Sequence, residues 1–534
     1  MRGIGAGGAG LTELARPRAR QRWRTAPAVA ALVALVLTAA CSSPSRPSRQ
    51  ARARPGQAQS SAQILSSAAQ IRAENALPGD PGWRITHPGS ERQVEGYADH
   101  TDVLPGAPVR LFVSTTARSF RVRAFRFGWY GGDLARLVWT SPGVPGQLQR
   151  AARTVAPGGM VVAPWQPSLT VPTVGWPPGS YLLRLDTSTG AQSYLPLVIR
   201  SPSVAGREVL VQAVTSYQAY NGWGGSSLYN GPNGSFATRS RRVSFDRPYS
   251  PERGAGFFFQ LEQPLVSLAE RLGLPLAYLT SIDANLDPHV LDGAAAVISE
   301  AHDEYWSGSM RATFTRARDH GENLAFFGAN AIYRKIRFQS SALGRDRIEV
   351  NYKVPQEDPL YGRDNALVTG NWPDPPDADP ESSLTGQAYG CFSSRDYPLV
   401  VTDPGGWVWA GSGVHRGESL PGVVGPESDQ VEVSSPTPRP VEVLARSPAA
   451  CAYGSTTESD VSYYVARSRA GVFDAGTEGW VCALPGARCS DQAPGPLARR
   501  VIEAATRNIL DAFAHGPAGL AHPAVDYVTG RVFP

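Results

Sequence analysis

The sequence predicts an antiparallel β-sandwich followed by an α/β domain with a mostly parallel, doubly wound sheet. Between residues 83 and 200, apolar and polar side chains alternate in short runs that glycine and proline separate. After Gly206 the runs become continuously apolar and alternate with stretches of helical spacing. Alternation is typical of strands with one buried face, whereas continuously apolar strands are typical of parallel sheets covered by helices.

The first domain is predicted over residues 78–203. Its strand-like runs include VRLFVSTT, FRVRAFRFGWYGG and SYLLRLDTSTGAQSYLPLVIR. Short period-two segments broken by turn residues favour an antiparallel, immunoglobulin-like sandwich. Such a domain could bind a substrate or brace its neighbour. Support is the simpler interpretation, because the aromatic residues of FGWYGG are equally well explained as core residues beside a glycine turn.

The second domain is predicted over residues 204–534. Its apolar strands are expected at EVLVQAV, LAYLTS, AAAVISE and NLAFFGAN, with helices at PLVSLAERLGL and GSMRATFTRARDHG between them. This alternation predicts a doubly wound sheet of the flavodoxin or class I amidotransferase type. Residues from about 350 to 454 are rich in proline, aspartate and glycine, and we expect an irregular insertion that covers the pocket. The run PLARRVIEAATRNILDAFAHG predicts a final amphipathic helix.

The N-terminus predicts export from a bacterial cell. Five arginines between residues 16 and 24 precede an uncharged apolar run from Ala26 to Ala40, which is typical of a signal peptide and short for a spanning helix. The run ends in LTAAC, which resembles a lipobox. Residues 1–41 are therefore expected to be a lipoprotein signal with lipid on Cys41, which would anchor the protein at the outer face of the cytoplasmic membrane. A secreted form and an uncleaved anchor stay open.

Residues 42–77 are rich in serine, proline, alanine, glutamine and arginine, and predict a disordered tether. The first 54 residues hold ten arginines and one acidic residue, so the formal charge of +5 for the whole chain becomes −4 for the remainder. A net negative domain argues against nucleic acid as a partner. The arginines of the tether are better suited to anionic lipid headgroups.

An even number of cysteines follows Cys41, as expected for a protein in an oxidising compartment. Cys482 and Cys489 close a short loop and are predicted to pair. Cys391 and Cys451 then form the second pair by elimination. None of the four has the spacing of a zinc finger, and pairing argues against a cysteine nucleophile.

Residues with distinctive chemistry follow three of the predicted strands. The exits read TSYQAYNGWGGSSLYNG, SEAHDEYWS and FFGANAIYR. Glycines in the first exit let the backbone bend toward a ligand, and Ser307 in the second is suited to cap the following helix. Ligands bind beyond the carboxyl ends of parallel strands, so these exits form the candidate site. Its residues are Tyr217, Tyr220, Tyr229, His302, Asp303, Glu304 and Asn330.

The motifs TSYQAYN, HDEYWS, NLAFFGANAIYRKIRF and GVFDAGTEGW resemble the C-terminal region of the large (beta) subunit of N,N-dimethylformamidase. The resemblance spans roughly residues 78–515 and is to the short, exported actinobacterial type of this family. It implies hydrolysis of linear amides at a mononuclear ferric (Fe3+) site that two tyrosinates and one glutamate hold. It also implies a small subunit and oligomers, so a homo-oligomer is expected.

Carried over residue by residue, the resemblance implies that Glu304 is the glutamate ligand and His302 a catalytic neighbour. Tyr220, with Tyr217 as the alternative, matches one tyrosinate, and Tyr229 matches the other because a similar Gly-rich and Arg-rich segment follows it. Ferric iron favours anionic oxygen donors and can lower the pKa of a phenol from about 10 to below neutrality. Asn330 is expected to bond the substrate carbonyl or to fix its loop.

Other interpretations of the same residues stay open. The tyrosines could be packing groups, Glu304 a helix cap and His302 a satisfied buried imidazole. The chain could also be a noncatalytic envelope lipoprotein that binds glycan or peptide, or a hydrolase with a different metal or none. Motifs of serine hydrolases, phosphate-binding loops and zincins are absent from the sequence. The leading hypothesis is therefore a metal-dependent hydrolase of a small-molecule or envelope amide.

Overall fold

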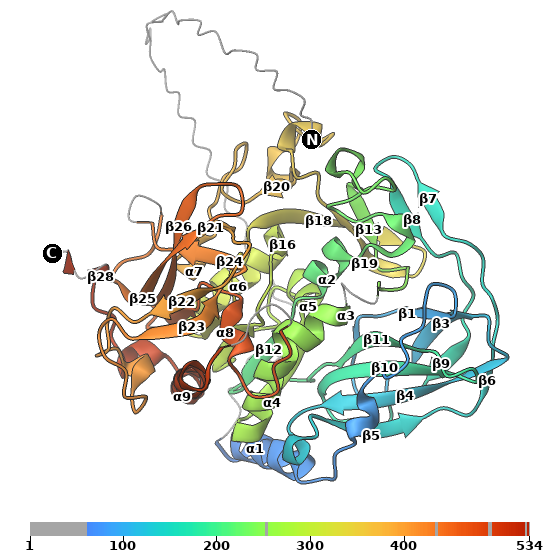
Figure 1. Ribbon diagram of the computed structural model, residues 1–534, viewed down its shortest axis with the longest axis horizontal. Coiled ribbons are helices and arrows are strands. Elements are labelled where there is room, and N and C mark those ends of the chain that lie inside the picture. The colour runs from blue at the N-terminus through green and yellow to red at the C-terminus, as the bar shows by residue number, and fades with distance from the viewer. Residues whose placement is uncertain (1–60, 251–254, 433–435, 490–493, 529–530, 533–534) are drawn as a thin grey trace, which may run out of the picture. The chain divides into compact units, whose positions relative to one another are not determined.

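The computed structural model describes residues 61–250, 255–432, 436–489, 494–528 and 531–532 (Figure 1). The predicted signal peptide, Cys41 and the tether up to residue 60 lie outside the described residues. The remainder of the predicted tether differs from the expectation, because Ser61–Asn75 forms helix α1, in which Ala68 and Ile71 are buried. None of the helices in the described ranges is both long and apolar enough to cross a membrane.

Two mainly antiparallel sheets form the region before residue 204. The first contains β1 (Val94–Ala98), β3 (Val109–Thr115) and β9 (Leu169–Val171). The second contains, in spatial order, β2 (Asp102–Val103), β11 (Gln192–Ile199), β10 (Gly179–Thr187), β4 (Ser119–Phe127) and β5 (Ala135–Thr140). β6 (Val144–Pro145) also pairs with β4. Figure 1 shows β11, β10, β4 and β5 side by side. A hairpin joins β7 (Arg153–Val155) to β8 (Met160–Val162). Alternate side chains of both sheets, including Leu111, Val122 and Leu183, form one core.

The largest sheet follows and has nine strands. Its first five strands in space are parallel: β14 (Leu276–Thr280), β12 (Glu208–Gln212), β15 (Ala296–Ser299), β17 (Asn323–Phe326) and β27 (Gly471–Asp474). β26 (Thr456–Val465) then pairs antiparallel with β27 and with β25 (Val441–Ala450). β28 (Tyr527–Val528) and β29 (Arg531–Val532) complete the order. The sheet is therefore mixed.

The predicted doubly wound, mostly parallel sheet of the flavodoxin type is wrong. Strands predominate in the described residues and are spread over several small mixed and antiparallel sheets. The continuous apolar runs located buried strands, but they carry no information about the direction of pairing. Turns of about five residues connect β25 to β26 and β26 to β27, and such short connections permit only antiparallel pairing because a parallel pair needs a long crossover.

The expected irregular insertion over about 350–454 also differs from the structure. It contains β20 (Gly370–Asn371), β21 (Ala388–Phe392), β22 (Tyr397–Val400), β23 (Ser419–Val424), β24 (Glu427–Gln430) and β25. β21 pairs with β24, and β22 pairs with β23. A further sheet contains β13 (Arg242–Ser244), β19 (Gly344–Val350), β18 (Arg334–Ser341) and β16 (Tyr305–Ser307), and β20 joins it at β18.

The helices lie between these strands in the sequence. They are α2 (Val214–Tyr220), α3 (Ala255–Phe257), a π-helical turn (Phe258–Glu262), α4 (Gln263–Leu272), α5 (Ser281–Leu286), α6 (Gly308–His320), α7 (Ser382–Thr385), α8 (Gly479–Cys482) and α9 (Pro496–Phe513). The predicted cap of α6 is confirmed, since the Ser307 hydroxyl accepts the Met310 N–H at 3.2 Å. α9 buries Val501, Ile509 and Phe513 in the main core. Both predicted disulfides, Cys391–Cys451 and Cys482–Cys489, are present.

Candidate functional site

Three neighbouring parallel strands end beside one another and supply the candidate residues. β12 leads into α2, which carries Tyr217 and Tyr220, and β15 leads into the loop that holds His302 and Glu304. β17 leads into the turn with Asn330. The last two exits approach closely at Gly328, where an added Cβ would lie 1.9 Å from the carbonyl oxygen of Ala301. Only glycine fits there, and the two loops are held together as a result.

Three oxygen atoms meet at the centre of the site. The Tyr220 hydroxyl donates to Glu304 Oε2 at 2.7 Å, and the Tyr229 hydroxyl donates to Tyr220 Oη at 2.8 Å. Tyr229 Oη also lies 3.0 Å from Glu304 Oε2. We call these atoms, Tyr220 Oη, Tyr229 Oη and Glu304 Oε2, the oxygen triangle. The sequence therefore predicted correctly that these three side chains converge.

Tyr217 does not take part in the oxygen triangle. Its side chain is only 1% exposed, and its hydroxyl donates to Glu262 in the main hydrophobic core. Burial and the charge of Glu262 raise the pKa of Tyr217 well above its usual value. Of the two tyrosines considered for the first ligand position, only Tyr220 lies where an ion could contact both Tyr229 and Glu304.

Two basic side chains lie beside the oxygen triangle, and burial lowers the pKa of one of them, Lys353, well below its usual value. Arg334 Nε donates to Glu304 Oε1 at 3.0 Å, and Lys353 Nζ lies 3.7 Å from the centre of the Tyr229 ring. Burial opposes the charge of Glu304, but the hydrogen bond with His302 and the charges of Arg334 and Lys353 outweigh it and lower the pKa of Glu304. Glu304, which is only 1% exposed, is therefore an anion.

The pKa values of the two phenols, Tyr220 and Tyr229, shift in the opposite direction to that of Glu304. Burial, followed by the charge of Glu304, raises the pKa of Tyr220 and of Tyr229 well above the usual value. With protein groups alone, both hydroxyls keep their protons, Tyr220 donating to the carboxylate and Tyr229 to Tyr220 Oη. A bound cation is the kind of group that would reverse this, because it favours the phenolate form.

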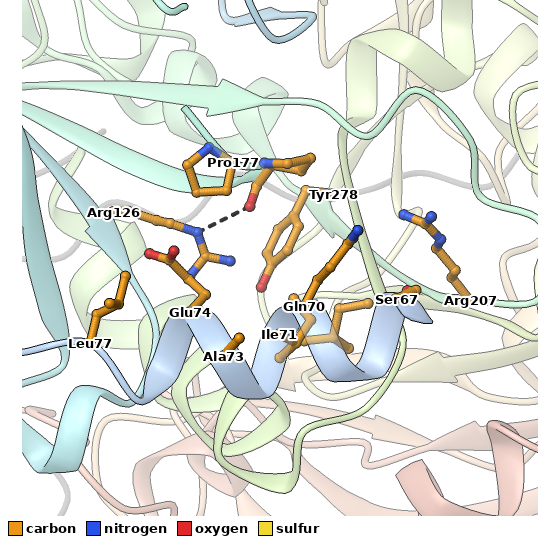
Figure 2. A pocket seen from close by; sticks show the side chains of 12 residues that line it. Ser67, Gln70, Ile71, Ala73, Glu74, Leu77, Arg126, Pro177, Arg207 and Tyr278 are labelled. Atoms are coloured by element: carbon orange, nitrogen blue, oxygen red, sulfur yellow. Dashed lines mark hydrogen bonds between the residues drawn. The ribbon is translucent and has the colours of Figure 1, made fainter. Parts of the chain in front are cut away.

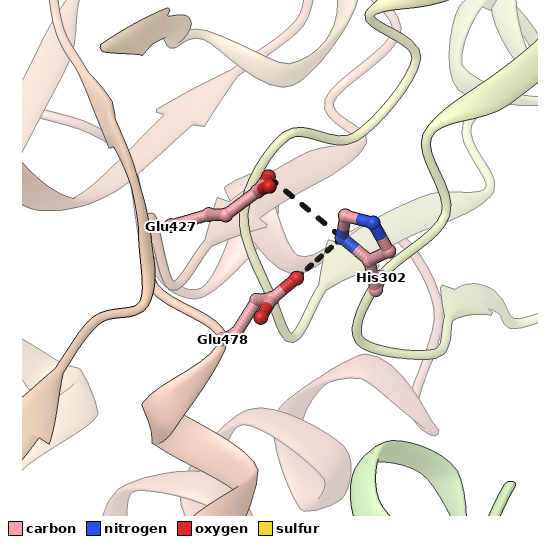
Figure 3. A group of neighbouring side chains, drawn as sticks. All are labelled: His302, Glu427 and Glu478. Atoms are coloured by element: carbon pink, nitrogen blue, oxygen red, sulfur yellow. Dashed lines mark ion pairs between the residues drawn. The ribbon is translucent and has the colours of Figure 1, made fainter. Parts of the chain in front are cut away.

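A second group of side chains lies against the oxygen triangle. His302 Nδ1 forms an ion pair with Glu478 and lies 3.9 Å from Glu427 Oε2, so both acids approach the same ring nitrogen (Figure 3). One ligand atom from each of His302, Glu427 and Glu478 lies within 4.8 Å of the others, and this acid–histidine cluster could hold a metal ion. His302 Nε2 faces the other way, 3.1 Å from Tyr220 Oη.

Charge stabilises a protonated His302 between these groups. Burial disfavours the imidazolium, but Glu478, Glu427 and the hydrogen bond with Glu304 outweigh burial and raise the pKa of His302 well above its usual value. Burial raises the pKa of Glu427, and the nearby charge of Glu478 adds to this effect. The cluster thus combines a histidine that holds a proton with acids that can orient it.

Asn330 is held in an unusual backbone conformation. Its φ is 58°, and its N–H donates to both carboxylate oxygens of Asp429 at 2.8 Å. Its side-chain Oδ1 is buried without a hydrogen-bond partner among the described residues. The backbone of Asn330 thus ties its turn to β24, while its side-chain Oδ1 is free to accept a hydrogen bond from a ligand.

Comparison with known proteins decides the family. Residues 121–492 match the family described as N,N-dimethylformamidase beta subunit-like, C-terminal. The chain belongs to this family. The match covers more than half of the sequence and confirms the family predicted from the motifs.

Other comparisons with this dimethylformamidase-like chain add little. No curated protein matches it. Among solved structures, a Paenibacillus sp. cycloisomaltooligosaccharide glucanotransferase complexed with cycloisomaltoheptaose is 11% identical, with a TM-score of 0.14. That match covers 40% of this chain and 27% of the other, and a likeness this weak carries no argument about fold or function.

Sequence reasoning missed part of the dimethylformamidase-like site. Glu427 and Asp429 lie on β24, inside the segment expected to be irregular, and Arg334 and Lys353 were not singled out. Glu478 belongs to the motif GVFDAGTEGW, and its position shortly after the apolar strand β27 is the same signal that identifies Glu304. Trp480, in the same motif, is fully buried and its indole N–H donates to the Thr506 hydroxyl, so it is a core residue.

Proposed function

We propose that this chain is a ferric amidohydrolase that cleaves the carbon–nitrogen bond of a linear amide. Tyr220, Tyr229 and Glu304 would hold the ion. The oxygen triangle is the observation that carries the proposal, and membership of the dimethylformamidase-like family supports the reaction class.

The donor set fits a small, hard cation. The three oxygens are 2.7, 2.8 and 3.0 Å apart. Adjacent ligands on an octahedral ion with bonds of about 2 Å lie roughly 2.8 Å apart, so one ion could contact all three. Phenolate and carboxylate oxygens are anionic donors of the kind that a hard ion prefers. When bound, the ferric ion would supply Lewis acidity, which polarises an amide carbonyl and makes water more acidic.

The protein would supply proton transfer through His302. Its Nδ1 is held by Glu478, and its Nε2 points toward the oxygen triangle. As an imidazolium, the ring could first donate its Nε2 proton to the nitrogen of the departing amine, and Nε2 could then regain a proton from the water that has added to the carbonyl. Glu478 and Glu427 would keep the ring oriented during both transfers. Asn330 Oδ1 could accept a hydrogen bond from a polar group of the substrate or product.

A second candidate is a hydrolase in which the acid–histidine cluster binds the ion instead. One histidine nitrogen and two carboxylates are ligands that zinc accepts, with an open position for water. The spacing of His302, Glu427 and Glu478 favours this alternative. The two candidates require different ligands, so single substitutions separate them.

Metal analysis of the purified chain tests the proposal. We expect about one iron per chain, a visible tyrosinate-to-iron charge-transfer band, and hydrolysis of short N-alkyl amides or of an envelope amide. Glu304→Ala should abolish the metal, the band and the hydrolysis, whereas Tyr217→Phe should keep all three. Zinc that is lost in Glu427→Ala supports the second candidate. A chain without metal that binds glycan or peptide would overturn both.

We also propose that the protein acts outside the cytoplasmic membrane, anchored by lipid on Cys41. The signal-like N-terminus and the two disulfides support this location. Fractionation of cells that make the wild-type chain should place it with the membrane, and Cys41→Ser should prevent lipid attachment. Wild-type chain found only in the cytoplasm would contradict the proposal.

A further inference from the structure

A cavity of about 430 Å³ lies between helix α1, the turn before β10 and strand β14 (Figure 2). None of its lining residues belongs to the oxygen triangle or the acid–histidine cluster. Its volume is within the usual range of small-molecule sites, which is about 300–1,000 Å³. The cavity is therefore large enough to bind a ligand that the proposed hydrolase site does not use.

One face of α1 forms a wall of this cavity. Ser67, Ile71 and Glu74 follow one another at intervals of four and three residues, which places them on the same side of the helix. Pro177 and Pro178 lie before β10, and Leu276 is buried on β14. Ile71, the two prolines and Leu276 thus give the cavity a mainly apolar lining.

The charges at one end of the cavity are already paired. Arg126 NH2 lies 2.6 Å from Glu270 Oε1, and its Nε donates to the carbonyl of Pro178 at 3.1 Å. Glu74 forms an ion pair with Arg136 at 2.6 Å. This end therefore offers little charge to a ligand.

The other end holds a cation that lacks a protein partner. The Arg207 guanidinium makes no ion pair or hydrogen bond within the described part of the chain, and its Nε is buried. The adjacent Glu208 does not compensate, because burial and the charge of Asp511 raise the pKa of its carboxyl well above the usual value. A partly buried cation without a partner is costly, and an anion in the cavity would relieve that cost.

We propose that this cavity binds a medium-length alkyl carboxylate. Its carboxylate would pair with Arg207, whose planar guanidinium suits two oxygens at once. The Gln70 amide belongs to the same end of the cavity as Ser67 and Arg207 and could add a hydrogen bond (Figure 2). The alkyl chain would lie along Ile71, Pro177 and Leu276. This site is separate from the proposed amidohydrolase centre and does not depend on it.

Calorimetric titration of octanoate into the full chain tests the proposal, with Cys41→Ser to exclude attached lipid. We expect octanoate to bind. Acetate and octanol should bind at least tenfold more weakly, because acetate lacks the alkyl chain and octanol lacks the carboxylate. Arg207→Gln should weaken octanoate at least tenfold, and Arg207→Lys less. Arg467→Gln, which changes an exposed arginine elsewhere, should have no effect.

A second variant locates the ligand without changing Arg207. Ala73 lines the cavity but is exposed on α1, so Ala73→Phe should fill space without disturbing the core. We expect this variant to keep the wild-type melting temperature and to bind octanoate at least tenfold more weakly. Absence of octanoate binding to the unsubstituted cavity would overturn the proposal. Unchanged binding in a folded Arg207→Gln or Ala73→Phe chain would also overturn it.

Discussion

The oxygen triangle and the acid–histidine cluster touch each other but are built differently. The triangle consists of oxygens from residues 220 to 304, and Arg334 provides positive charge beside it. The cluster combines a histidine with two carboxylates from beyond residue 420. Within the described residues, neither Glu427 nor Glu478 pairs with a lysine or arginine, so His302 is their partner.

This difference suggests a division of roles. Beside the triangle, the hydrogen bond with His302 and the permanent charge of Arg334 keep Glu304 ionised, so an anionic ligand stays available to a metal ion. In the cluster, the charge that balances the acids is a proton on His302, which can leave and return. We infer that the triangle holds the ion and the cluster moves protons, and each prediction below tests one side of that comparison.

The largest effect is expected from Glu304→Ala. The substitution removes one of three ligand oxygens and leaves Arg334 without its carboxylate partner. Iron content should fall close to zero, and amide hydrolysis should fall about a thousandfold or more, as expected when several kcal/mol of transition-state stabilisation is lost. Elemental analysis and steady-state kinetics would measure both quantities.

Glu427→Gln is the matched control for that substitution. It changes a buried glutamate of the cluster, which lies near Nδ1 of His302, whereas Glu304 lies near Nε2. Iron content should stay near one per chain. If Glu427→Gln lost the ion while Glu304→Ala retained it, the roles assigned to the two groups would have to be exchanged.

Glu478→Gln should separate proton transfer from metal binding. The amide keeps the shape of the side chain but removes the charge that supports the His302 imidazolium. We expect kcat to fall by about a hundredfold or more, which is the usual contribution of a general acid–base group, while iron and the charge-transfer band persist. A variant with normal turnover would show that the ion pair has no catalytic role.

Phenylalanine substitutions compare the three tyrosines of the first strand exit. Tyr220→Phe and Tyr229→Phe should each weaken iron binding by roughly ten- to a hundredfold or more and shift the charge-transfer band, because one phenolate is lost. Tyr217→Phe should leave the band unchanged and lower the free energy of unfolding by about 1–3 kcal/mol, because Glu262 loses a buried partner. A change of the band in Tyr217→Phe would contradict the assignment.

The sequence was informative about the triangle for a definite reason. Tyr220, Tyr229 and Glu304 follow apolar strands, and β12 and β15 are neighbours in register, so reading the strand exits was enough to bring these residues together. The choice between Tyr217 and Tyr220 was not accessible in this way. The two lie three residues apart on α2, and a small rotation of that helix decides which one faces Glu304.

The cluster was harder to predict because its strands pair over long distances in the sequence. Glu427 begins β24, whose partner β21 starts at Ala388, and neither strand has a clear period. The same limit explains the error in the sheet. Apolar runs showed where β17 and β27 are buried, but only the short turns around β26 determine that the sheet continues with antiparallel strands.

The smallest effect on amide hydrolysis is expected when the disulfides are replaced. These substitutions should lower the free energy of unfolding without changing metal binding. Cys391 pairs in register with Ser428, next to Glu427, and its bridge to Cys451 spans 60 residues, whereas Cys482–Cys489 spans 7. Loop entropy predicts that replacing each pair by serine costs about 4 and about 2 kcal/mol respectively, measurable by denaturant unfolding. Because Cys391–Cys451 supports the strand of Glu427, its loss should lower kcat a few-fold with iron unchanged. Loss of iron would instead show that the triangle depends on the segment carrying the cluster, and the division of roles would fail.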